Sequence, residues 1–214
     1  MRPLRFALAQ GLLLNDALTA LRAIGMDVSG ITPGGRRLVV DGGNLEFVLA
    51  RPSDIATYVE RGAADLGIVG KDVLLESEAR VMELADLGFG ACRLVVAAPR
   101  GAVERSLDEY RHLGTLEVAT KYPNVAERHF RARDIAVEIV KVAGSAEVAP
   151  LVGLADWIVD LVATGSTLRA NGLAIVEEIA SSTARLVANP ASYQLRRHEI
   201  APIVERLAQW AAER

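Results

Sequence analysis

The stretch Gly153-Leu-Ala-Asp-Trp-Ile-Val-Asp-Leu-Val-Ala-Thr-Gly-Ser-Thr-Leu-Arg-Ala-Asn-Gly172 decides how the fold of this chain is interpreted. Its apolar run from Trp157 to Val162 predicts a buried parallel strand, because strands covered on both faces are almost continuously hydrophobic. Asp160 interrupts this run near the end of the expected strand. The residues that follow predict a turn leading into a short helix.

This turn is rich in groups that bind phosphate. Thr164, Gly165, Ser166 and Thr167 provide three hydroxyls, a glycine and several backbone N–H groups, and such a turn can cradle a phosphate. A carboxylate at the strand end, that of Asp160, can accept hydrogen bonds from sugar hydroxyls. The pattern therefore fits a ribose 5-phosphate. The alternative is an ordinary strand-to-helix turn whose hydroxyls cap the helix.

Two segments before this stretch place charged residues in comparable turns. Lys121 follows a predicted strand at Glu117–Thr120 and precedes a predicted helix, an arrangement that favours anions. Glu147 lies in a predicted short helix after Gly144, where its carboxylate could face the same site.

The first half of the chain alternates predicted strands with predicted helices. A strand is expected at Leu4–Ala9. A β-hairpin is expected where Arg37–Val40 and Leu45–Leu49 flank Asp41-Gly42-Gly43-Asn44, because the two glycines permit positive φ.

Further charged residues lie at the ends of predicted elements. Arg51 opens a predicted helix, and a short buried strand within residues 64–72 runs into a turn that carries Lys71 and Asp72. These last two are either ligand contacts or a solvated pair at a helix start. Arg93 lies in a predicted strand at Cys92–Ala98.

Short strands that alternate with helices predict an α/β architecture. Gly88 and Gly90 flank Phe89, an aromatic residue expected to be exposed, and predict a bend or hinge where the chain passes between two lobes. The expected lobes are residues 1–90 with 180–214, and residues 91–179, which carry the phosphate loop.

The C-terminal tail, residues 191–214, predicts a helix that Pro202 interrupts. Its apolar face includes Leu207 and Trp210. This face either packs against its own lobe or docks a partner.

Composition excludes several classes of function. The 214 residues carry 24 Lys plus Arg against 27 Asp plus Glu, so the net charge of −3 offers no broad basic face for duplex nucleic acid. No apolar stretch approaches the length that spans a bilayer, and the start of the chain has no signal-peptide pattern. A cytoplasmic protein is expected. The single cysteine, Cys92, excludes a disulfide or a cysteine-based metal site within one chain.

With these pieces in place, the sequence resembles the short form of the ATP phosphoribosyltransferase family over nearly its whole length. The motifs that carry the resemblance are residues 51–54, 62–72, 86–90 with 92–94, 119–124, Gly144 with Glu147, and 153–172. Several matches in the same order along the chain are more specific than any single loop.

The resemblance implies a fold and an activity. The fold would be two α/β lobes of the periplasmic-binding-protein type II, with the active site in the cleft between them. The activity would be the first step of histidine biosynthesis, in which N1 of the ATP adenine displaces pyrophosphate from phosphoribosyl pyrophosphate.

The resemblance also implies roles for particular residues. Asp160 and Glu147 would act on the ribose side, and Thr164, Gly165, Ser166 and Thr167 would bind the 5-phosphate. Weaker candidates for ATP or pyrophosphate contacts are Arg51, Lys71, Asp72, Arg93 and Lys121. Mg²⁺ would be carried by the substrate pyrophosphate, with no metal ligand assigned to the protein.

The family's short form also implies a partner. It works with a regulatory subunit that resembles histidyl-tRNA synthetase, so a homodimer within a hetero-oligomer is expected. Neither nucleic acid nor a membrane is expected as a partner.

One segment departs from the family pattern. After the first strand, family members usually have a Pro-Lys-Gly-Arg-like segment, whereas this chain has Ala9-Gln10-Gly11-Leu12. The two cations are replaced by Gln10 and Leu12. A catalytically weakened transferase is therefore one alternative, and a non-enzymatic two-lobed binding protein is another, because fold alone does not fix function.

Overall fold

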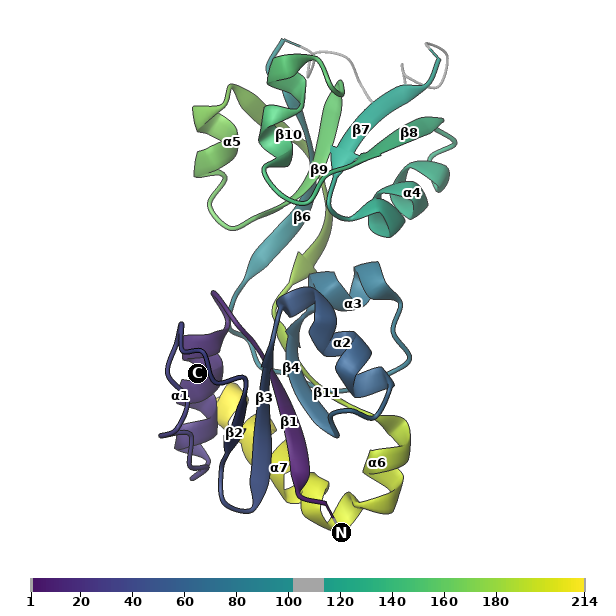
Figure 1. The fold of residues 1–214 in the computed structure, drawn as a ribbon. Helices are drawn as coiled ribbons and strands as arrows, with labels where there is room; N and C mark the ends of the chain where they lie inside the picture. The colour runs from purple at the N-terminus through teal and green to yellow at the C-terminus, as the bar shows by residue number, and fades with distance from the viewer. Residues whose placement is uncertain (1, 102–113, 214) are drawn as a thin grey trace. The chain divides into compact units, whose positions relative to one another are not determined.

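The structure, a computed structural model, describes residues 2–101 and 114–213. The chain divides into two compact units, Met1–Ala91 with Thr183–Arg214, and Cys92–Ser182 (Figure 1). Each unit is a β-sheet covered by helices, which confirms the predicted α/β architecture. Of the expected tail, Arg214 lies outside the described residues.

The first unit is built on a six-stranded sheet in the order β2-β3-β1-β4-β11-β5. Strands β3, β1 and β4 are parallel, and β2, β11 and β5 are antiparallel to their neighbours. The strands are β1 Leu4–Ala9, β2 Val39–Asp41, β3 Leu45–Ala50, β4 Leu66–Gly70, β5 Met82–Asp86 and β11 Ala184–Ala188. The predicted first strand and the β2–β3 hairpin are both confirmed.

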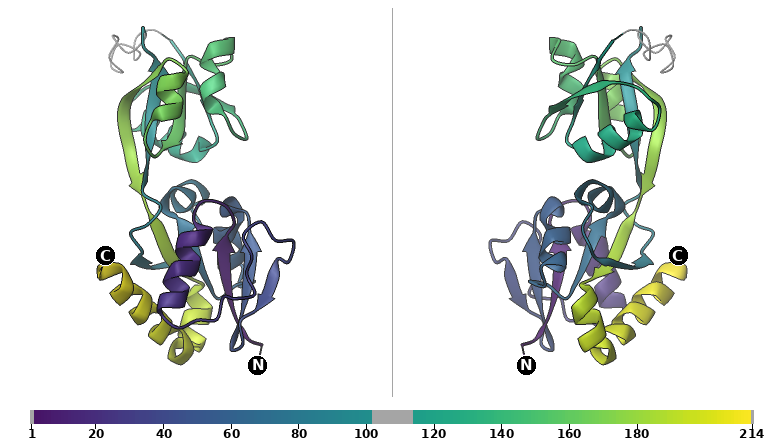
Figure 2. Two further views of the ribbon diagram at one scale, coloured as in Figure 1. Left: turned by 90° about the vertical axis from the view of Figure 1, so that its left-hand side faces the viewer. Right: turned by 90° about the vertical axis from the view of Figure 1, so that its right-hand side faces the viewer.

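Helices cover both faces of this sheet. They are α1 Leu14–Ala23, α2 Pro52–Glu60, α3 Lys71–Ser77, α6 Pro190–Leu195 and α7 Arg197–Ala212. Alternate residues of β1 enter different cores: Phe6 and Leu8 pack with α1 and α7, whereas Ala7 and Ala9 pack with α2. Figure 2 shows α1 and α7 on the same side of the sheet. This alternation is the two-residue period of a strand that is buried on both faces.

The C-terminal tail differs from its prediction. Pro202 lies inside a continuous α7, and the helical tail breaks instead at Arg196, whose φ of −122° is not helical. Ile203 and Leu207 are buried in the core of the first unit, so this face packs against its own unit. That apolar burial offsets the hydrogen bond that a proline costs a helix.

Phe89 also differs from its prediction. The residue is buried, not exposed, and its ring meets that of Trp210 edge-on at a centroid distance of 6.3 Å. The two neighbouring glycines have φ values of +73° and +68°, which permit the chain to turn and bury the ring.

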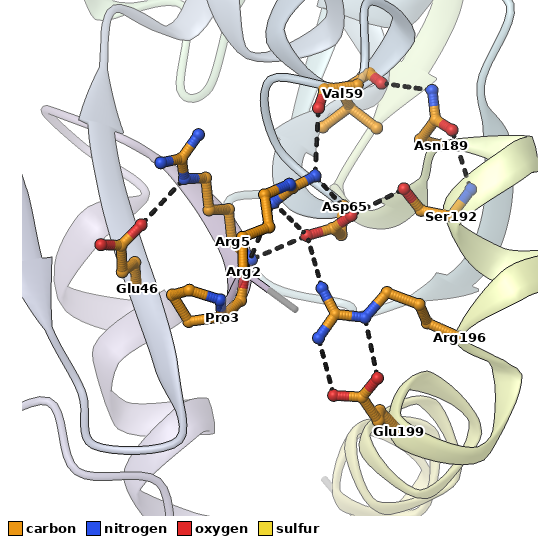
Figure 3. Close-up of polar contacts among 11 residues, drawn as sticks. Arg2, Pro3, Arg5, Glu46, Val59, Asp65, Asn189, Ser192, Arg196 and Glu199 are labelled. Atoms are coloured by element: carbon orange, nitrogen blue, oxygen red, sulfur yellow. Dashed lines mark hydrogen bonds and ion pairs between the residues drawn. The ribbon is translucent and has the colours of Figure 1, made fainter.

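Asp65 is the centre of a buried polar network in the first unit (Figure 3). Its carboxylate, 1% exposed, accepts hydrogen bonds from the Arg2 guanidinium at 2.8 and 2.9 Å and from the Arg5 backbone N–H at 2.9 Å. The Ser192 hydroxyl donates at 2.6 Å, and the Arg196 guanidinium lies 3.6 Å away. Because a buried charge is costly unless it is paired, this network fixes the N-terminus and α6 against the start of β4.

The second unit is built on a five-stranded sheet in the order β10-β6-β9-β7-β8. Strand β7 is parallel to both β8 and β9, whereas β6 is antiparallel to β9 and β10. The strands are β6 Cys92–Pro99, β7 Leu116–Thr120, β8 Val137–Lys141, β9 Trp157–Val162 and β10 Leu173–Ser182. The stretch expected as a buried strand is therefore β9, parallel to its neighbour on one side only.

Each face of this second sheet has its own cover. Helix α4 (Pro123–Arg131) packs on one face, where Phe130 meets Trp157 and Val159. The other face is covered by the short helices η2 (Ala146–Val148), η3 (Pro150–Val152) and α5 (Ser166–Ala170). Among residues 2–101 and 114–213, no helix is long and apolar enough to cross a membrane.

Candidate active site

A cavity of about 310 Å³ lies at one edge of the second sheet. Because β7, β8 and β9 are parallel, their carboxyl ends meet at this edge, the usual position of ligand sites in open α/β sheets. Lys121 follows β7, Val142 follows β8, and Asp160 belongs to β9. The full lining is Lys121, Val142, Gly144, Ser145, Ala146, Glu147, Asp160, Leu161 and Thr167. The cavity thus brings together four residues that the sequence singled out.

Asp160 is a buried carboxylate in the wall of this cavity. It is 9% exposed, and its Oδ1 accepts a hydrogen bond from the backbone N–H of Leu161 at 2.8 Å. Burial raises the pKa of Asp160 above its ordinary value, and the nearby Glu147 carboxylate acts in the same direction. The Leu161 N–H and the Lys121 ammonium oppose this rise in the pKa. A buried acceptor of this kind gains most from a ligand that donates hydrogen bonds.

Glu147 reaches the cavity from η2. Ser145, two residues before Glu147, has a φ of +47°. This left-handed conformation turns the chain directly into the short helix. The Glu147 side chain is half-buried and lines the cavity with Asp160. Two carboxylates therefore face one small volume, each able to accept hydrogen bonds from hydroxyl groups.

The loop between β9 and α5 is compact and internally bonded. Thr164 Oγ1 donates to Ser166 Oγ at 3.0 Å and accepts from the Ser166 backbone N–H at 3.3 Å. Gly165 has a φ of +73°, a conformation that favours glycine. Thr167 alone of the four loop residues lines the cavity, while Thr164 and Ser166 are exposed beside it. The N-cap residue of α5 is Gly165, so no side chain caps the helix, and the Thr164 hydroxyl instead accepts from the backbone N–H of Ser166, the first helical residue.

Arg169 of α5 packs against this loop and was not predicted from the sequence. Its Nη1 donates to the Thr164 carbonyl oxygen at 3.0 Å. A Cβ atom at Gly165 would lie 3.1 Å from the same nitrogen, so the guanidinium packs closely over the loop. A signal was available, since Arg169 follows Gly165 by four residues, the spacing that brings side chains onto the preceding turn of a helix.

Lys121 and its two neighbours form a second bonded turn. The Lys121 ammonium lies 5.0 Å from the centroid of the Tyr122 ring, a cation–π distance. The Tyr122 backbone N–H donates to Thr120 Oγ1 at 2.8 Å. Thr120 was also missed as a functional candidate, because its hydroxyl acts on a strand 39 residues away in the chain.

The remaining candidates lie outside this cavity. Arg93 is at the start of β6, opposite Val162, and its guanidinium is 3.2 Å from Glu178. Three others belong to the first unit, at the carboxyl ends of its parallel strands. They are Arg51 directly after β3, and Lys71 and Asp72 directly after β4.

These first-unit candidates have different surroundings. Arg51 is exposed, whereas the Lys71 ammonium pairs with Glu83. Asp72 is 7% exposed, and its carboxylate folds back so closely over Gly70 that a Cβ there would lie 2.2 Å from Oδ1. Lys71 and Asp72 are therefore structured groups at a helix start, not a freely solvated pair.

The oxygen donors of the cavity limit how Mg²⁺ could bind here. Within the described ranges, no three side chains of Asp, Glu, His or Cys gather closely enough to hold a metal ion. The cavity offers two carboxylates, which suit Mg²⁺ as oxygen donors but fall short of an all-protein site. These residues therefore fit a metal that arrives with a phosphate-bearing ligand.

Comparisons with known proteins agree over nearly the whole chain. Residues 51–209 match the profile of the family described as ATP phosphoribosyltransferase. An ATP phosphoribosyltransferase of Rubrobacter xylanophilus is 51% identical, covering 94% of this chain and 93% of its own. One from Moorella thermoacetica is 48% identical, with 98% and 94% covered.

Solved structures agree as well. One chain of the ATP phosphoribosyl transferase (HisG:HisZ) complex from Thermotoga maritima is 33% identical and has a TM-score of 0.84, with 99% of this chain and 100% of that chain covered. The protein Tv2483 bound to L-arginine, 16% identical with a TM-score of 0.63, covers 99% of this chain and 86% of its own and shows a shared fold alone. The α/β fold is that of the type II periplasmic-binding proteins, and the chain belongs to the ATP phosphoribosyltransferase family.

Proposed function

We propose that this chain transfers the phosphoribosyl group of phosphoribosyl pyrophosphate to N1 of the ATP adenine, releasing pyrophosphate in the first step of histidine biosynthesis. The observation that carries this proposal is the cavity at the carboxyl edge of the second sheet. It combines Asp160, Glu147 and Lys121 with Thr167 of the hydroxyl-rich loop. This donor set matches a sugar that carries hydroxyl groups and a phosphate.

The ribose and its 5-phosphate have complementary partners in this unit. The ribose hydroxyls donate to the Asp160 and Glu147 carboxylates. The 5-phosphate accepts from the hydroxyls and backbone N–H groups of Thr164, Gly165, Ser166 and Thr167.

Five charged residues are the proposed partners of ATP or pyrophosphate. They are Arg51, Lys71, Asp72, Arg93 and Lys121. Lys71 and Arg93 now pair with glutamates at partly exposed positions. Such pairs are worth about 0.2–1 kcal/mol, so exchanging a glutamate for a substrate phosphate costs little.

The chemistry requires alignment more than acid–base groups. A bond forms between adenine N1, which uses its own lone pair, and C1 of the ribose, while the C1–O bond breaks and pyrophosphate leaves with the electron pair. The Asp160 and Glu147 carboxylates stabilise the positive charge that develops on the ribosyl group, and this effect is strong in a partly buried site. Mg²⁺ carried by the substrate pyrophosphate would supply neutralising charge for the leaving group.

A partner subunit completes the proposal. The Thermotoga maritima relative is part of a HisG:HisZ complex. We infer that this chain likewise works with a regulatory subunit that resembles histidyl-tRNA synthetase, as a homodimer within a hetero-oligomer. ATP and phosphoribosyl pyrophosphate are intracellular metabolites, which favours the cytoplasm as its location.

The test is a direct assay. Purified chain with ATP, phosphoribosyl pyrophosphate and Mg²⁺ is expected to form phosphoribosyl-ATP, followed by absorbance, and Thr167→Ala is expected to weaken phosphoribosyl pyrophosphate binding by about 1.5–3 kcal/mol. Thr57→Ala, an exposed threonine on α2, is the matched control and should bind like the unaltered chain. Absence of product both with and without the partner would reject the proposed reaction.

A further inference from the structure

Thr120 is a buried polar residue at the carboxyl end of β7. Its hydroxyl and its carbonyl oxygen both form hydrogen bonds beside the candidate site. It is 0% exposed, and its hydroxyl donates to the Val159 carbonyl oxygen at 2.7 Å. The same hydroxyl accepts from the Tyr122 backbone N–H at 2.8 Å. The Thr120 carbonyl oxygen accepts from the Val142 N–H at 3.0 Å. One residue therefore joins the end of β7 to the strand on either side of it, β8 and β9.

Each of these partners adjoins the cavity. Val159 immediately precedes Asp160, and Tyr122 immediately follows Lys121, while Val142 lines the cavity itself. The Lys121 ammonium rests over the Tyr122 ring, so a shift of Tyr122 would also move this cation. Thr120 lies on the α4 face of the sheet with Val118, since side chains alternate along a strand, and so does not itself face the cavity.

We propose that Thr120 is a positioning residue of the phosphoribosyl pyrophosphate site, whose hydroxyl fixes the separation of the Lys121 ammonium and the Asp160 carboxylate. This inference rests on the proposed function. Lys121 and Asp160 reach the cavity from different strands, and the Thr120 hydroxyl bonds the backbone beside both. Such an arrangement matters because a misplacement of about 1 Å can cost about 100-fold in rate.

Three substitutions separate positioning from simple packing. Thr120→Val keeps the shape and removes the hydroxyl, whereas Thr120→Ser keeps the hydroxyl and removes a methyl group. Val118→Ala is the matched control, because Val118 is also 0% exposed on the same face of β7 and adjoins no cavity residue. Thr120→Ala replaces Thr120→Val if the latter does not fold, as judged by circular dichroism.

Binding is the first measurement. Titration calorimetry is expected to show that Thr120→Val raises the Kd for phosphoribosyl pyrophosphate by about tenfold or more. Thr120→Ser and Val118→Ala should stay within about threefold of the unaltered chain, although Val118→Ala loses stability through its cavity. An equal loss of affinity in Thr120→Val and Val118→Ala would show that any weakening of the core reduces binding, and would overturn the proposal.

A second measurement needs no substrate. In the folded protein the Lys121 charge lowers the pKa of Asp160, so displacement of Lys121 in Thr120→Val should raise the Asp160 pKa measured by carbon NMR of its carboxyl group. Val118→Ala should leave this pKa unchanged. An unchanged pKa in folded Thr120→Val overturns the proposal, whatever the binding result.

The two measurements distinguish the possible failures. If the unaltered chain does not bind phosphoribosyl pyrophosphate, the proposed function fails, and the assignment of Thr120 to that site fails with it. A shift in the Asp160 pKa would still show that Thr120 positions the two groups. If binding is intact and Thr120→Val changes the pKa but not the Kd, the proposed function stands and the inference about Thr120 is wrong.

Discussion

At the scale of single residues, the buried Asp160 carboxylate lowers the stability of the fold at neutral pH but is proposed to bind the ligand. Burial raises its pKa in the folded state, so folding favours the protonated carboxyl. Its contribution to stability is therefore fully present below the unfolded pKa and is lost as the pH rises through the folded pKa. At neutral pH the ionised form of this group therefore lowers stability, a cost consistent with the ligand-binding role proposed for Asp160.

Asp160→Asn is accordingly expected to raise the free energy of unfolding at neutral pH while weakening phosphoribosyl pyrophosphate binding by about 1.5–3 kcal/mol. Asparagine keeps an oxygen that can accept from the Leu161 N–H, so the backbone contact survives the change. Urea denaturation should show the gain at neutral pH and its disappearance below the ordinary pKa of an aspartate. Lower stability of the variant at neutral pH, or unaltered affinity, would contradict this account.

The difference between predicted and unpredicted site residues has a physical cause. Asp160 and Thr167 follow from one continuous stretch, because strand, turn and helix start are consecutive in the chain. Thr120 acts through a partner 39 residues away, and no local pattern indicates which strand lies beside β7. The local pattern identified groups that can bind a ligand but not the residues that hold those groups in place.

At the scale of elements, the turn between β1 and α1 carries the departure from the family pattern. Leu12 is 97% exposed, and Gln10 is half-buried with its backbone N–H bonded to the Ala50 carbonyl oxygen at 2.9 Å, directly before Arg51. Arginine at position 12 would lose no buried apolar contact. The turn could therefore accommodate the lysine and arginine that family members usually have at these positions.

Gln10→Lys with Leu12→Arg is expected to lower the KM for ATP or phosphoribosyl pyrophosphate at low salt. The gain should vanish at about 1 M salt, where the Debye length falls to about 3 Å. Leu195→Arg is the matched control, because Leu195 is also an exposed leucine of the first unit, 81% exposed and on α6. The same gain in this control would indicate a general charge effect, and no gain in the double variant would show that positions 10 and 12 do not act on the substrates.

Element prediction succeeded where short-range chemistry decides and failed where packing decides. The β2–β3 hairpin follows from its glycine turn. Pro202, in contrast, predicts an interruption from its missing N–H, a penalty of about 3 kcal/mol. Burial of Ile200, Ile203 and Leu207 in the core of the first unit outweighs this penalty, and that burial depends on strands more than a hundred residues away.

At the scale of the whole molecule, the chain builds each unit around parallel strands and returns to complete the first. Strand β11 enters the first sheet between β4 and β5, although β4 and β11 are separated by the entire second unit. Hydrophobic patterning can indicate that residues 184–188 form a strand. It cannot indicate this insertion, because a two-residue period specifies the faces of a strand and not its neighbours.

A partner subunit is expected to control the turnover of the assembled enzyme. The isolated chain is expected to turn over slowly, and a synthetase-like subunit is expected to raise kcat severalfold by favouring the active conformation of the chain. A partner can do this only by binding the active conformation of the chain more tightly than the inactive one. Histidine bound to the partner would shift the same equilibrium back, so inhibition should appear only in the complex.

The measurement is the phosphoribosyl-ATP assay on the chain alone, the partner alone and the mixture, each with and without histidine. A mixture made with Asp160→Asn is the control, because loss of activity there assigns the chemistry to this chain and not to the partner. Binding of the two proteins is followed separately by sedimentation, so that a failure to associate is distinguished from a failure to activate. Full turnover by the chain alone, with histidine inhibition in the absence of any partner, would place both catalysis and control within this single chain and contradict the prediction.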